Sequence, residues 1–427
     1  MYTKYRNRHF RFISIFLVIF TICFLYTTYD PKKNDDQHSE TSPTQLFDTN
    51  TSIYVPLSEV KQQSYRTVLL WTDLFSDIHW HQEAFFNPYA IVACSSTHQC
   101  QFTRDTRRLS KSSIVAFHLY DINRYRLPER TTQSKTDNQS WVFITGESPI
   151  NFYYQNPSFL PHMLDSYFDQ SISYKYDSPF SIFSPTIKSR TLSNTYEIQQ
   201  ERQSNNNSLK SKNKPILWFV SNCNTFSQRE KYVEELKKYI EIDIYGKCGR
   251  KCSKEKNSQC QANLNEYYFY LSFENSRCHS YITEKFWNII SDNKNRLVPI
   301  VMGASINDYK QIAPKQSFIH VDQYKTPEEL AKYLNYLIAN PKKYLTYLQW
   351  REYNQIEPIN STRWKTLLCP LCQMAYETHL SPSIRMNFSA WYHPTTQCHH
   401  DDAELFTKCK QANLRDPMNW IHNTKCP

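Results

Sequence analysis

The segment Tyr267–Trp287, with the sequence YYFYLSFENSRCHSYITEKFW, decides the fold because a strand-like run passes directly into a helix-like run. Its first seven residues are aromatic enough for a buried strand, and Thr283 can cap the helix that follows. Open amide groups at the start of such a helix would face a phosphate, and Lys285 adds a positive charge there. Glu284 can accept hydrogen bonds from ribose hydroxyls. The junction therefore suits a sugar nucleotide.

This segment resembles the donor-binding signature of the α1,3-fucosyltransferases of the GT10 type, which take L-fucose from GDP-fucose. The similarity covers most of the chain from about Thr67 to Cys372 and is strongest at Glu147-Ser148-Pro149, Ile244-Tyr245-Gly246 and Phe273 to Trp287. A cysteine-rich insert and a cysteine-rich tail make the pattern most similar to the invertebrate enzymes that fucosylate the core of glycoprotein N-glycans.

Two successive halves of alternating strand and helix patterns predict an α/β fold. The second half contains a β-α-β unit from Ile216 to Ile244 and a helix that begins at Pro327. Such halves indicate two Rossmann-like domains facing a cleft, the arrangement called GT-B. The expected strands cover residues 67–71, 90–93, 113–118, 141–144, 216–220, 267–273, 297–302 and 318–321.

The N-terminus predicts a transmembrane signal anchor. Basic residues between Lys4 and Arg11 precede an apolar run, which keeps this end cytosolic, and no small-x-small cleavage site follows. A polar stretch near residue 200 is interpreted as an interdomain loop. The predicted segments are a cytoplasmic tail (1–11), the signal anchor (12–29), a stem (30–64), an N-terminal acceptor-side α/β domain (65–198), a linker (199–214), a GDP-fucose-binding α/β domain (215–365) and a Cys-rich C-terminal segment (366–427).

A short membrane span suits the Golgi, so we expect a single-pass type II Golgi membrane protein with a lumenal catalytic domain. The glycosylation sequons agree with a lumenal chain, and they begin at Asn50, Asn138, Asn206, Asn360 and Asn387. All of the 13 cysteines except Cys23 lie beyond the apolar run. In that compartment structural disulfides are favoured over zinc or redox chemistry. The disulfide candidates, whose pairing stays open, are Cys94, Cys100, Cys248, Cys252, Cys260, Cys278, Cys369 and Cys372.

Charge and glycine content exclude other classes of protein. The formal net charge of +10 is spread among acidic residues without a basic stripe, which disfavours nucleic acid as a partner. With only 4 glycines, the chain has neither a Gly-x-Gly-x-x-Gly fingerprint nor a phosphate-binding loop. It also lacks the Asp-x-Asp that holds a metal in GT-A enzymes. We therefore expect no required cofactor and no metal site, an expectation compatible with stimulation by manganese.

Glu147 is the candidate catalytic base, because it follows an apolar strand and a carboxylate there can take a proton from an attacking hydroxyl. A loop or helix-capping glutamate is the alternative, and the resemblance favours the base. Arg229 is expected to clamp the diphosphate with support from Lys285, although it could lie exposed on a charged helix. The complete set of candidate donor contacts is Ser221, Asn222, Arg229, Tyr245, Gly246, Glu274, Asn275, Tyr281, Glu284 and Lys285.

The resemblance implies an inverting glycosyltransferase that moves L-fucose from GDP-fucose to the 3-hydroxyl of N-acetylglucosamine on glycoprotein glycans. The N-glycan core is the favoured acceptor. The alternatives are a Lewis-type enzyme that acts on terminal lactosamine and an inactive lumenal glycan-binding relative. Two departures from the family pattern are a charged loop at residues 291–296, which could alter closure of the cleft, and Lys175 and Pro179, where relatives commonly have Arg and Asp.

Overall fold

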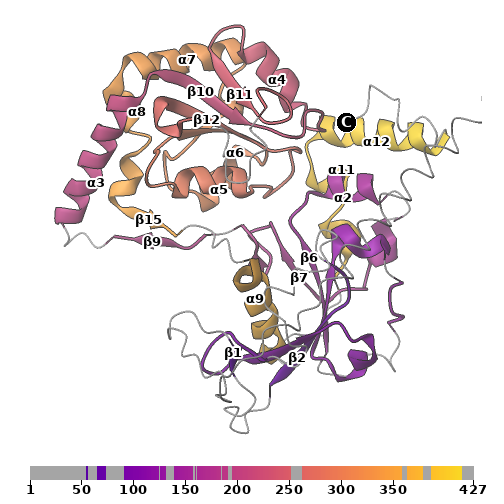
Figure 1. The fold of residues 1–427 in the computed structure, drawn as a ribbon. Helices are drawn as coiled ribbons and strands as arrows, with labels where there is room; N and C mark the ends of the chain where they lie inside the picture. Colours follow the sequence, from indigo (N-terminus) through magenta and orange to yellow (C-terminus); the bar gives the residue numbers. More distant parts are fainter. Residues whose placement is uncertain are drawn as a thin grey trace, which may run out of the picture. The chain divides into compact units, whose positions relative to one another are not determined.

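The computed structural model describes residues 54–55, 65–73, 91–124, 126–130, 139–156, 159, 161–183, 185–190, 195–251, 262–357, 363–377 and 386–415. Two predominantly parallel sheets organise the compact unit formed by residues 53–427 (Figure 1). The predicted α/β class is therefore confirmed. Among the described residues, no helix is both long and apolar enough to cross a bilayer. The predicted signal anchor and stem lie outside the described residues, apart from Tyr54 and Val55.

The first sheet has the strand order β1-β3-β4-β2-β5-β6-β7-β8. All neighbours from β4 to β8 pair in parallel, whereas β1 and β3 join the edge in antiparallel pairs. The bounds are β1 (Tyr54–Val55), β2 (Arg66–Leu70), β3 (Ile91–Ala93), β4 (Gln99–Thr103), β5 (Ile114–His118), β6 (Ser140–Thr145), β7 (Gln170–Ser173) and β8 (Phe180–Ser181).

Residues that follow the second sheet in the sequence contribute to the covering of both faces of this sheet. Helix α9 (Arg363–Glu377) packs on one face through Leu368, Leu371 and their neighbours. The opposite face packs against α2 (Pro149–Gln155) and the C-terminal helices α10 (Phe388–Trp391) and α12 (His400–Arg415). A short helix, α11 (Pro394–Gln397), lies between the last two. Strands buried on both faces read as continuous apolar runs, which is why β5 and β6 were predictable.

The second sheet is parallel throughout, with the order β11-β10-β12-β13-β14. Helices α4 and α7 cover one face, and α5 and α6 cover the other (Figure 1). The strands are β10 (Lys214–Phe219), β11 (Ile242–Tyr245), β12 (Tyr267–Phe273), β13 (Val298–Met302) and β14 (Ile319–His320). The helices are α4 (Arg229–Leu236), α5 (Glu284–Ser291), α6 (Ile306–Ile312), α7 (Pro327–Ala339) and α8 (Pro341–Leu345). The predicted β-α-β unit and the helix start at Pro327 are confirmed.

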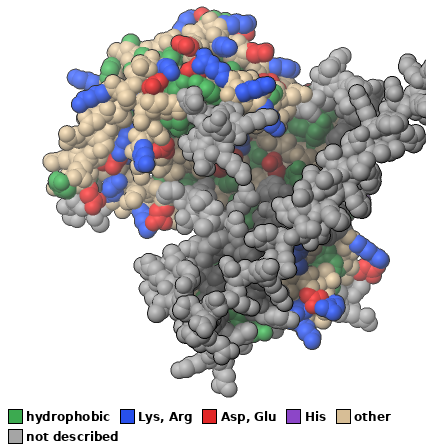
Figure 2. All heavy atoms as spheres, viewed as in Figure 1, with side chains coloured by type: hydrophobic (Ala, Val, Ile, Leu, Met, Phe, Trp, Pro, Cys, Tyr) green, Lys and Arg blue, Asp and Glu red, His purple; other side chains and the backbone are tan. Residues whose placement is uncertain are grey.

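The interdomain loop predicted near residue 200 is wrong, because these residues form helix α3 (Thr195–Ser208). Its residues are polar on all sides, so the sequence has no apolar periodicity that would indicate a helix. Charged and amide groups hold it instead: Arg296 binds Glu201 and also donates to Asn205 Oδ1 at 2.6 Å. Arg202 pairs with Glu352 at 2.8 Å. The surface shown in Figure 2 mixes basic and acidic side chains over this part of the molecule.

A small antiparallel pair joins β9 (Ile187–Ser189) to β15 (Asn354–Ile356), two segments that flank the second sheet in sequence. The remaining helical turns are of the 3-10 type. They cover residues Thr106–Lys111, Leu119–Arg124, Pro161–Leu164, Leu209–Ser211, Leu264–Glu266, Val321–Gln323 and Gln349–Glu352.

Candidate active site

The strand order of the second sheet creates a topological switch point between β10 and β12. The chain leaves β10 for β11 on one side and then crosses to β12 on the other. Ligands of open parallel sheets bind beyond the carboxyl ends of the strands at such a point. Ser221 and Asn222 follow β10, and Glu274 and Asn275 follow β12. The fold therefore brings four of the predicted donor residues to one edge.

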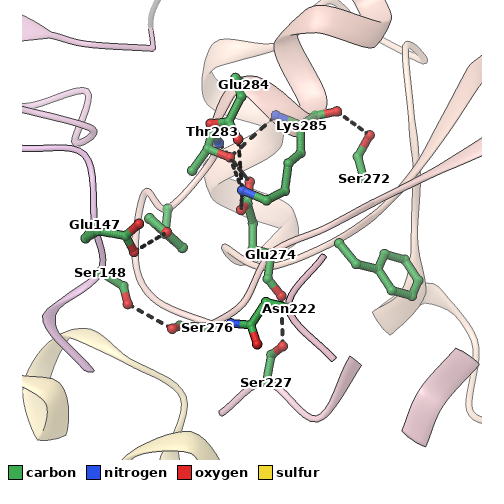
Figure 3. A network of polar contacts seen from close by, with 12 residues as sticks. Glu147, Ser148, Asn222, Ser227, Ser272, Glu274, Ser276, Thr283, Glu284 and Lys285 are labelled. Atoms are coloured by element: carbon green, nitrogen blue, oxygen red, sulfur yellow. Dashed lines mark hydrogen bonds and ion pairs between the residues drawn. The ribbon is translucent and has the colours of Figure 1, made fainter. Parts of the chain in front are cut away.

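Helix α5 begins where the sequence predicted it. Thr283 is the N-cap, and its side chain accepts a hydrogen bond from the backbone N–H of Lys285. Glu284 is the first helical residue and is exposed. The Thr283 backbone N–H and hydroxyl both donate to Glu274 Oε1, at 2.8 and 2.7 Å. Glu274 thus fixes the entry to the helix from the end of the neighbouring strand (Figure 3).

Glu274 and Lys285 form an ion pair at this entry, and the lysine of the pair is partly exposed. Glu274 is fully buried, and its Oε2 lies 3.0 Å from Lys285 Nζ. Burial raises the pKa of Glu274, and the Lys285 ammonium offsets part of that rise. Against the lowering effect of burial, the carboxylates of Glu274 and Glu284 raise the pKa of Lys285 above its ordinary value. Lys285 is therefore a permanent cation at the start of α5.

Glu147 lies at the carboxyl end of β6, just before α2. Ser148 caps α2, and Pro149 occupies its first turn, so the helix starts sharply after Glu147. The half-buried Glu147 carboxylate accepts hydrogen bonds from Asn151 Nδ2 at 2.9 Å and from the Tyr281 hydroxyl at 3.3 Å. Both partners are uncharged donors. The carboxylate is therefore oriented without being committed to a salt bridge.

Two contacts join Glu147 and its neighbour to the loop after β12. Tyr281, which belongs to that loop, donates to Glu147, and the Ser148 and Ser276 hydroxyls lie 2.8 Å apart (Figure 3). Burial raises the pKa of Tyr281 well above its ordinary value, and the Glu147 charge adds to the effect. The Tyr281 hydroxyl therefore keeps its proton and serves as a donor. The predicted base therefore lies beside the loop between β12 and α5, residues 274–283, here called the donor loop.

Arg229 lies behind the switch point rather than on an exposed helix face. Its guanidinium is buried, donates to the carbonyls of Phe273 and Asn222, and lies over the Trp218 ring. Burial lowers the pKa of Arg229 from its ordinary value. In this arrangement Arg229 joins the ends of β10 and β12. Its role as a diphosphate clamp stays a prediction.

Tyr245 and Gly246 end β11 beside the same edge. Gly246 has φ +106°, and a Cβ there would lie 2.3 Å from the Val220 carbonyl oxygen, so no other residue fits without strain. A disulfide between Cys223 and Cys248 ties the turn after β11 to the loop after β10. The backbone at residues 220–222 is thereby confined from two sides. Asn275 Oδ1 is buried nearby and finds no partner among the described residues.

The C-terminal residues 386–409, here called the C-terminal segment, were missed as part of the site. The Tyr392 hydroxyl donates to the backbone carbonyl of Glu147. Asp402, which is fully buried, accepts from the backbone and guanidinium of Arg277 at 2.6 to 2.8 Å. These contacts join residues more than a hundred positions apart. Only the tail cysteines had drawn attention to this segment in the sequence.

The disulfides confirm the structural reading of the cysteines. Both members of the Cys369-x-x-Cys372 motif, which lies in α9, form disulfides with the first sheet at β4 and just after β3. The described pairs are Cys94–Cys369, Cys100–Cys372, Cys223–Cys248 and Cys278–Cys398, and Cys409 is also disulfide-bonded. Cys252 and Cys260 lie outside the described residues.

Of the predicted glycosylation sites, Asn206 lies exposed on α3 and Asn387 caps α10. Asn50, Asn138 and Asn360 lie outside the described residues. No group of three or more His, Cys, Asp or Glu side chains in the described ranges is placed to hold a metal ion. Metal independence and glycosylation both stay predictions.

The two departures from the family pattern lie in different places. The loop at residues 291–296 precedes β13, so it lies at the amino edge of the parallel sheet, opposite the edge that carries Glu274. Lys175 is buried just after β7 and donates to the Trp391 carbonyl at 2.9 Å and to Gln397 Oε1 at 2.6 Å. Its ammonium lies 4.2 Å from the centre of the Trp391 ring. Lys175 thus joins the first sheet to the C-terminal segment.

Two protein-family models match adjacent parts of the chain. The model described as glycosyltransferase family 10 (fucosyltransferase) C-term matches residues 209–391, and the model described as fucosyltransferase, N-terminal matches residues 63–184. Crystal structures of an α1,3-fucosyltransferase with GDP and with GDP-fucose align at 18% and 15% identity. Their TM-scores are 0.44 and 0.42, and each alignment covers 78% of this chain and 94% of the other.

Three relatives represent the sequence matches. Glycoprotein 3-alpha-L-fucosyltransferase A of Drosophila melanogaster is 44% identical over 46% of this chain. Alpha-(1,3)-fucosyltransferase fut-1 of Caenorhabditis elegans is 32% identical over 61%. The human 4-galactosyl-N-acetylglucosaminide 3-alpha-L-fucosyltransferase FUT5 is 30% identical over 76%. The aligned stretches span 37%, 58% and 79% of these proteins, respectively.

Proposed function

This chain belongs to glycosyltransferase family 10, the fucosyltransferases, and we propose that it transfers L-fucose from GDP-fucose to the 3-hydroxyl of an N-acetylglucosamine. The observation that carries the proposal is the contact between Glu147 and Tyr281, because it joins the candidate base to the loop that bears the candidate donor residues. The reaction class and the role of Glu147 as base come from the family, and the contact with Tyr281 supports that role.

We assign the chain to the GT-B architecture, with a Rossmann-like half on each side of a cleft. The parallel sheets and the hydroxyl contact between Ser148 and Ser276, which joins the carboxyl ends of β6 and β12, support this assignment. GDP-fucose would lie at the switch point of the second sheet, along Asn222, Gly246 and the start of α5. The acceptor would approach from β6.

Glu147 acts as the general base. As the acceptor 3-oxygen attacks the anomeric carbon of fucose, the bond from that carbon to the GDP phosphate breaks, and the 3-hydroxyl proton passes to the Glu147 carboxylate. A single displacement of this kind inverts the anomeric centre. The amide of Asn151 and the hydroxyl of Tyr281 orient the carboxylate without neutralising it.

Lys285 stabilises the charge that develops on GDP as it leaves. Its pKa is raised, so it is protonated at neutral pH, and it lies at the N-terminus of α5 where the helix dipole also favours an anion. Arg229 would join it only if its guanidinium releases the carbonyls that it holds in this structure. These cations would take the role that a metal ion plays in GT-A enzymes. We propose that transfer requires no metal ion.

Among acceptors we propose the N-glycan core. The Drosophila relative, which shares the highest of the three identities, is named a glycoprotein fucosyltransferase, and the disulfide-bonded C-terminal segment matches the cysteine-rich pattern noted for such enzymes. A Lewis-type activity on terminal lactosamine is the alternative, because human FUT5 is named a 4-galactosyl-N-acetylglucosaminide 3-alpha-L-fucosyltransferase. An inactive relative has lost its main support, since the loop at residues 291–296 lies on the opposite edge of the sheet.

The deciding experiment incubates the full-length, detergent-solubilised enzyme with GDP-fucose and a panel of glycans, and identifies the products by mass spectrometry. Core N-acetylglucosamine should gain one fucose on its 3-hydroxyl, while lactosamine without a core should gain none. Fucosylated lactosamine alone would establish the Lewis-type activity. Glycan binding without release of GDP would establish the inactive relative.

We place the enzyme in the Golgi membrane as a single-pass type II protein with residues 30–427 in the lumen. The basic N-terminus, the apolar run at 12–29 and the disulfides support this placement. Its partners would be GDP-fucose and glycoprotein N-glycans. A protease-protection assay on sealed microsomes tests the topology, because a lumenal domain resists added protease until detergent opens the membrane.

A further inference from the structure

The C-terminal segment, residues 386–409, reaches both the candidate base and the donor loop. We propose that Tyr392 is a positioning residue for Glu147, and that the C-terminal segment fixes the base relative to the donor loop. The inference rests on the proposed function, because it assigns a role in the same reaction. It concerns a residue that lies 245 positions from the base in sequence.

The backbone of Glu147 lies between β6 and α2 and belongs to neither element. Its polar groups therefore lack the partners that a ladder or helix would give them. The backbone N–H of Glu147 donates to Thr145 Oγ1 at 3.3 Å, and its carbonyl accepts from the Tyr392 hydroxyl. Thr145 Oγ1 and Tyr392 Oη lie 3.1 Å apart. Two side-chain hydroxyls thus hold the peptide that carries the base.

Tyr392 itself is rigidly held. The side chain is fully buried among aromatic rings, including Phe143 and Phe152. The preceding residue, Trp391, is held by Lys175 through its carbonyl and its ring. Burial raises the pKa of Tyr392 well above its ordinary value, so the hydroxyl keeps the proton that it donates. Tyr392 is therefore a fixed donor.

The same segment is attached to the donor loop. Residues 277–279 and 397–399 run antiparallel: the His279 N–H donates to the Gln397 carbonyl at 2.7 Å, and the His399 N–H donates to the Arg277 carbonyl at 2.6 Å. The Cys278–Cys398 disulfide and the Arg277–Asp402 pair reinforce this contact. Tyr392 and the donor loop are thus tied through a few residues of one chain segment.

Removal of the Tyr392 hydroxyl is the direct test. We expect Tyr392→Phe to lower kcat by about tenfold, because a misplaced base slows proton removal. The Kd for GDP-fucose should stay within about twofold, because the ties between the segment and the donor loop do not use this hydroxyl. Thr145→Val, which removes the other hydroxyl, should also lower kcat, whereas Thr145→Ser should retain it. Rates are normalised to the enzyme that binds GDP, so misfolded protein does not count as slow enzyme.

The matched control is Tyr153→Phe, a change of the same kind in the same aromatic cluster. Tyr153 is buried on α2, and its hydroxyl finds no hydrogen-bond partner among the described residues. This variant should keep the wild-type kcat. If Tyr392→Phe and Tyr153→Phe both keep it, or if both lose it equally, the positioning role is overturned.

Crystal structures of the two variants separate this inference from the proposed function. The Glu147 carboxylate should move away from the Tyr281 hydroxyl in Tyr392→Phe and stay in place in Tyr153→Phe. If wild-type enzyme transfers no fucose while Glu147 moves in this way, the proposed function fails and the positioning role stands. If transfer is observed and Glu147 stays in place in both variants, the positioning role fails alone.

Discussion

The carboxyl ends of β6 and β7 in the first sheet and of β12 in the second all carry charged side chains, but the partners of these charges differ. At β12, Glu274 and Lys285 form an ion pair with each other. At β6, Glu147 is held by an amide and a hydroxyl. At β7, Lys175 is held by a carbonyl, an amide oxygen and an aromatic ring.

Under the proposed function, this difference would distinguish a framework for binding from a site for proton transfer. A charge paired with its opposite keeps its protonation state, which suits a cation that must face a diphosphate. A carboxylate held by uncharged donors can accept a proton without breaking an ion pair. We therefore propose that the β12 end serves binding and that the β6 end serves acid–base chemistry. Four changes test it.

The largest effect is expected from Glu147→Gln. The amide cannot take the acceptor proton, so kcat should fall by about a thousandfold. The Kd for GDP-fucose and the thermal midpoint should stay close to wild type, because the Glu147 carboxylate forms no ion pair in the described structure. Transfer assays and calorimetric titration measure the two quantities. A variant with a near-wild-type rate would remove Glu147 as the base.

The next effect concerns Lys175, whose pKa burial lowers from 10.5 to about 8. Between those pH values the lysine is charged in the unfolded chain but neutral in the folded protein. Stability is therefore lost as the pH falls from 10.5 to 8. Wild type should lose about 3 kcal/mol more than Lys175→Met over this range, by urea unfolding. Lys212, another buried lysine, is common to both proteins and cancels from the difference. If the free energy of unfolding changed equally with pH in wild type and in Lys175→Met, Lys175 would not be the buried lysine that causes the loss.

A smaller effect is expected from Glu274→Gln. The amide oxygen can still accept from Thr283, but Lys285 loses its buried partner, so the free energy of unfolding should fall by about 2 kcal/mol. Glu147→Gln is the matched control and should change it little. Equal losses of stability at the two glutamates would erase the distinction between the two regions.

The smallest effect compares two glycines that follow strands. A Cβ at Gly303 would lie 2.7 Å from Glu274 Cγ, so Gly303→Ala should destabilise the protein by about 1 kcal/mol and weaken GDP binding. A Cβ at Gly146 meets only the Phe183 ring at 3.3 Å. Gly146→Ala should therefore change the thermal midpoint less. The opposite ranking would show that the β12 end is the looser of the two.

The second sheet was the more predictable from sequence, because its elements follow one another and its site residues lie next to its strands. The aromatic run that became β12, the Thr283 cap and the start of α7 all depend on near neighbours. The helix at residues 195–208 was missed because polar contacts with distant residues stabilise it. It has no apolar face that a sequence pattern could reveal.

The contacts between Glu147 and Tyr392 and between Arg277 and Asp402 could not be read from one sequence. The first contact joins residues 245 positions apart through a single hydroxyl. The second joins residues 125 positions apart through a single carboxylate. Tyrosines and aspartates are common enough that no local pattern marks these two. The cysteine-rich tail gave the only hint, and the bond between Cys398 and Cys278 became known only from the structure.

A crystal structure of the enzyme with GDP and an N-glycan core acceptor would show directly whether Glu147 is the base. We expect a Glu147 carboxylate oxygen within about 3 Å of the acceptor 3-hydroxyl, with Lys285 on the diphosphate. A bound acceptor whose 3-hydroxyl meets a different carboxylate, with Glu147 turned away from it, would contradict the account.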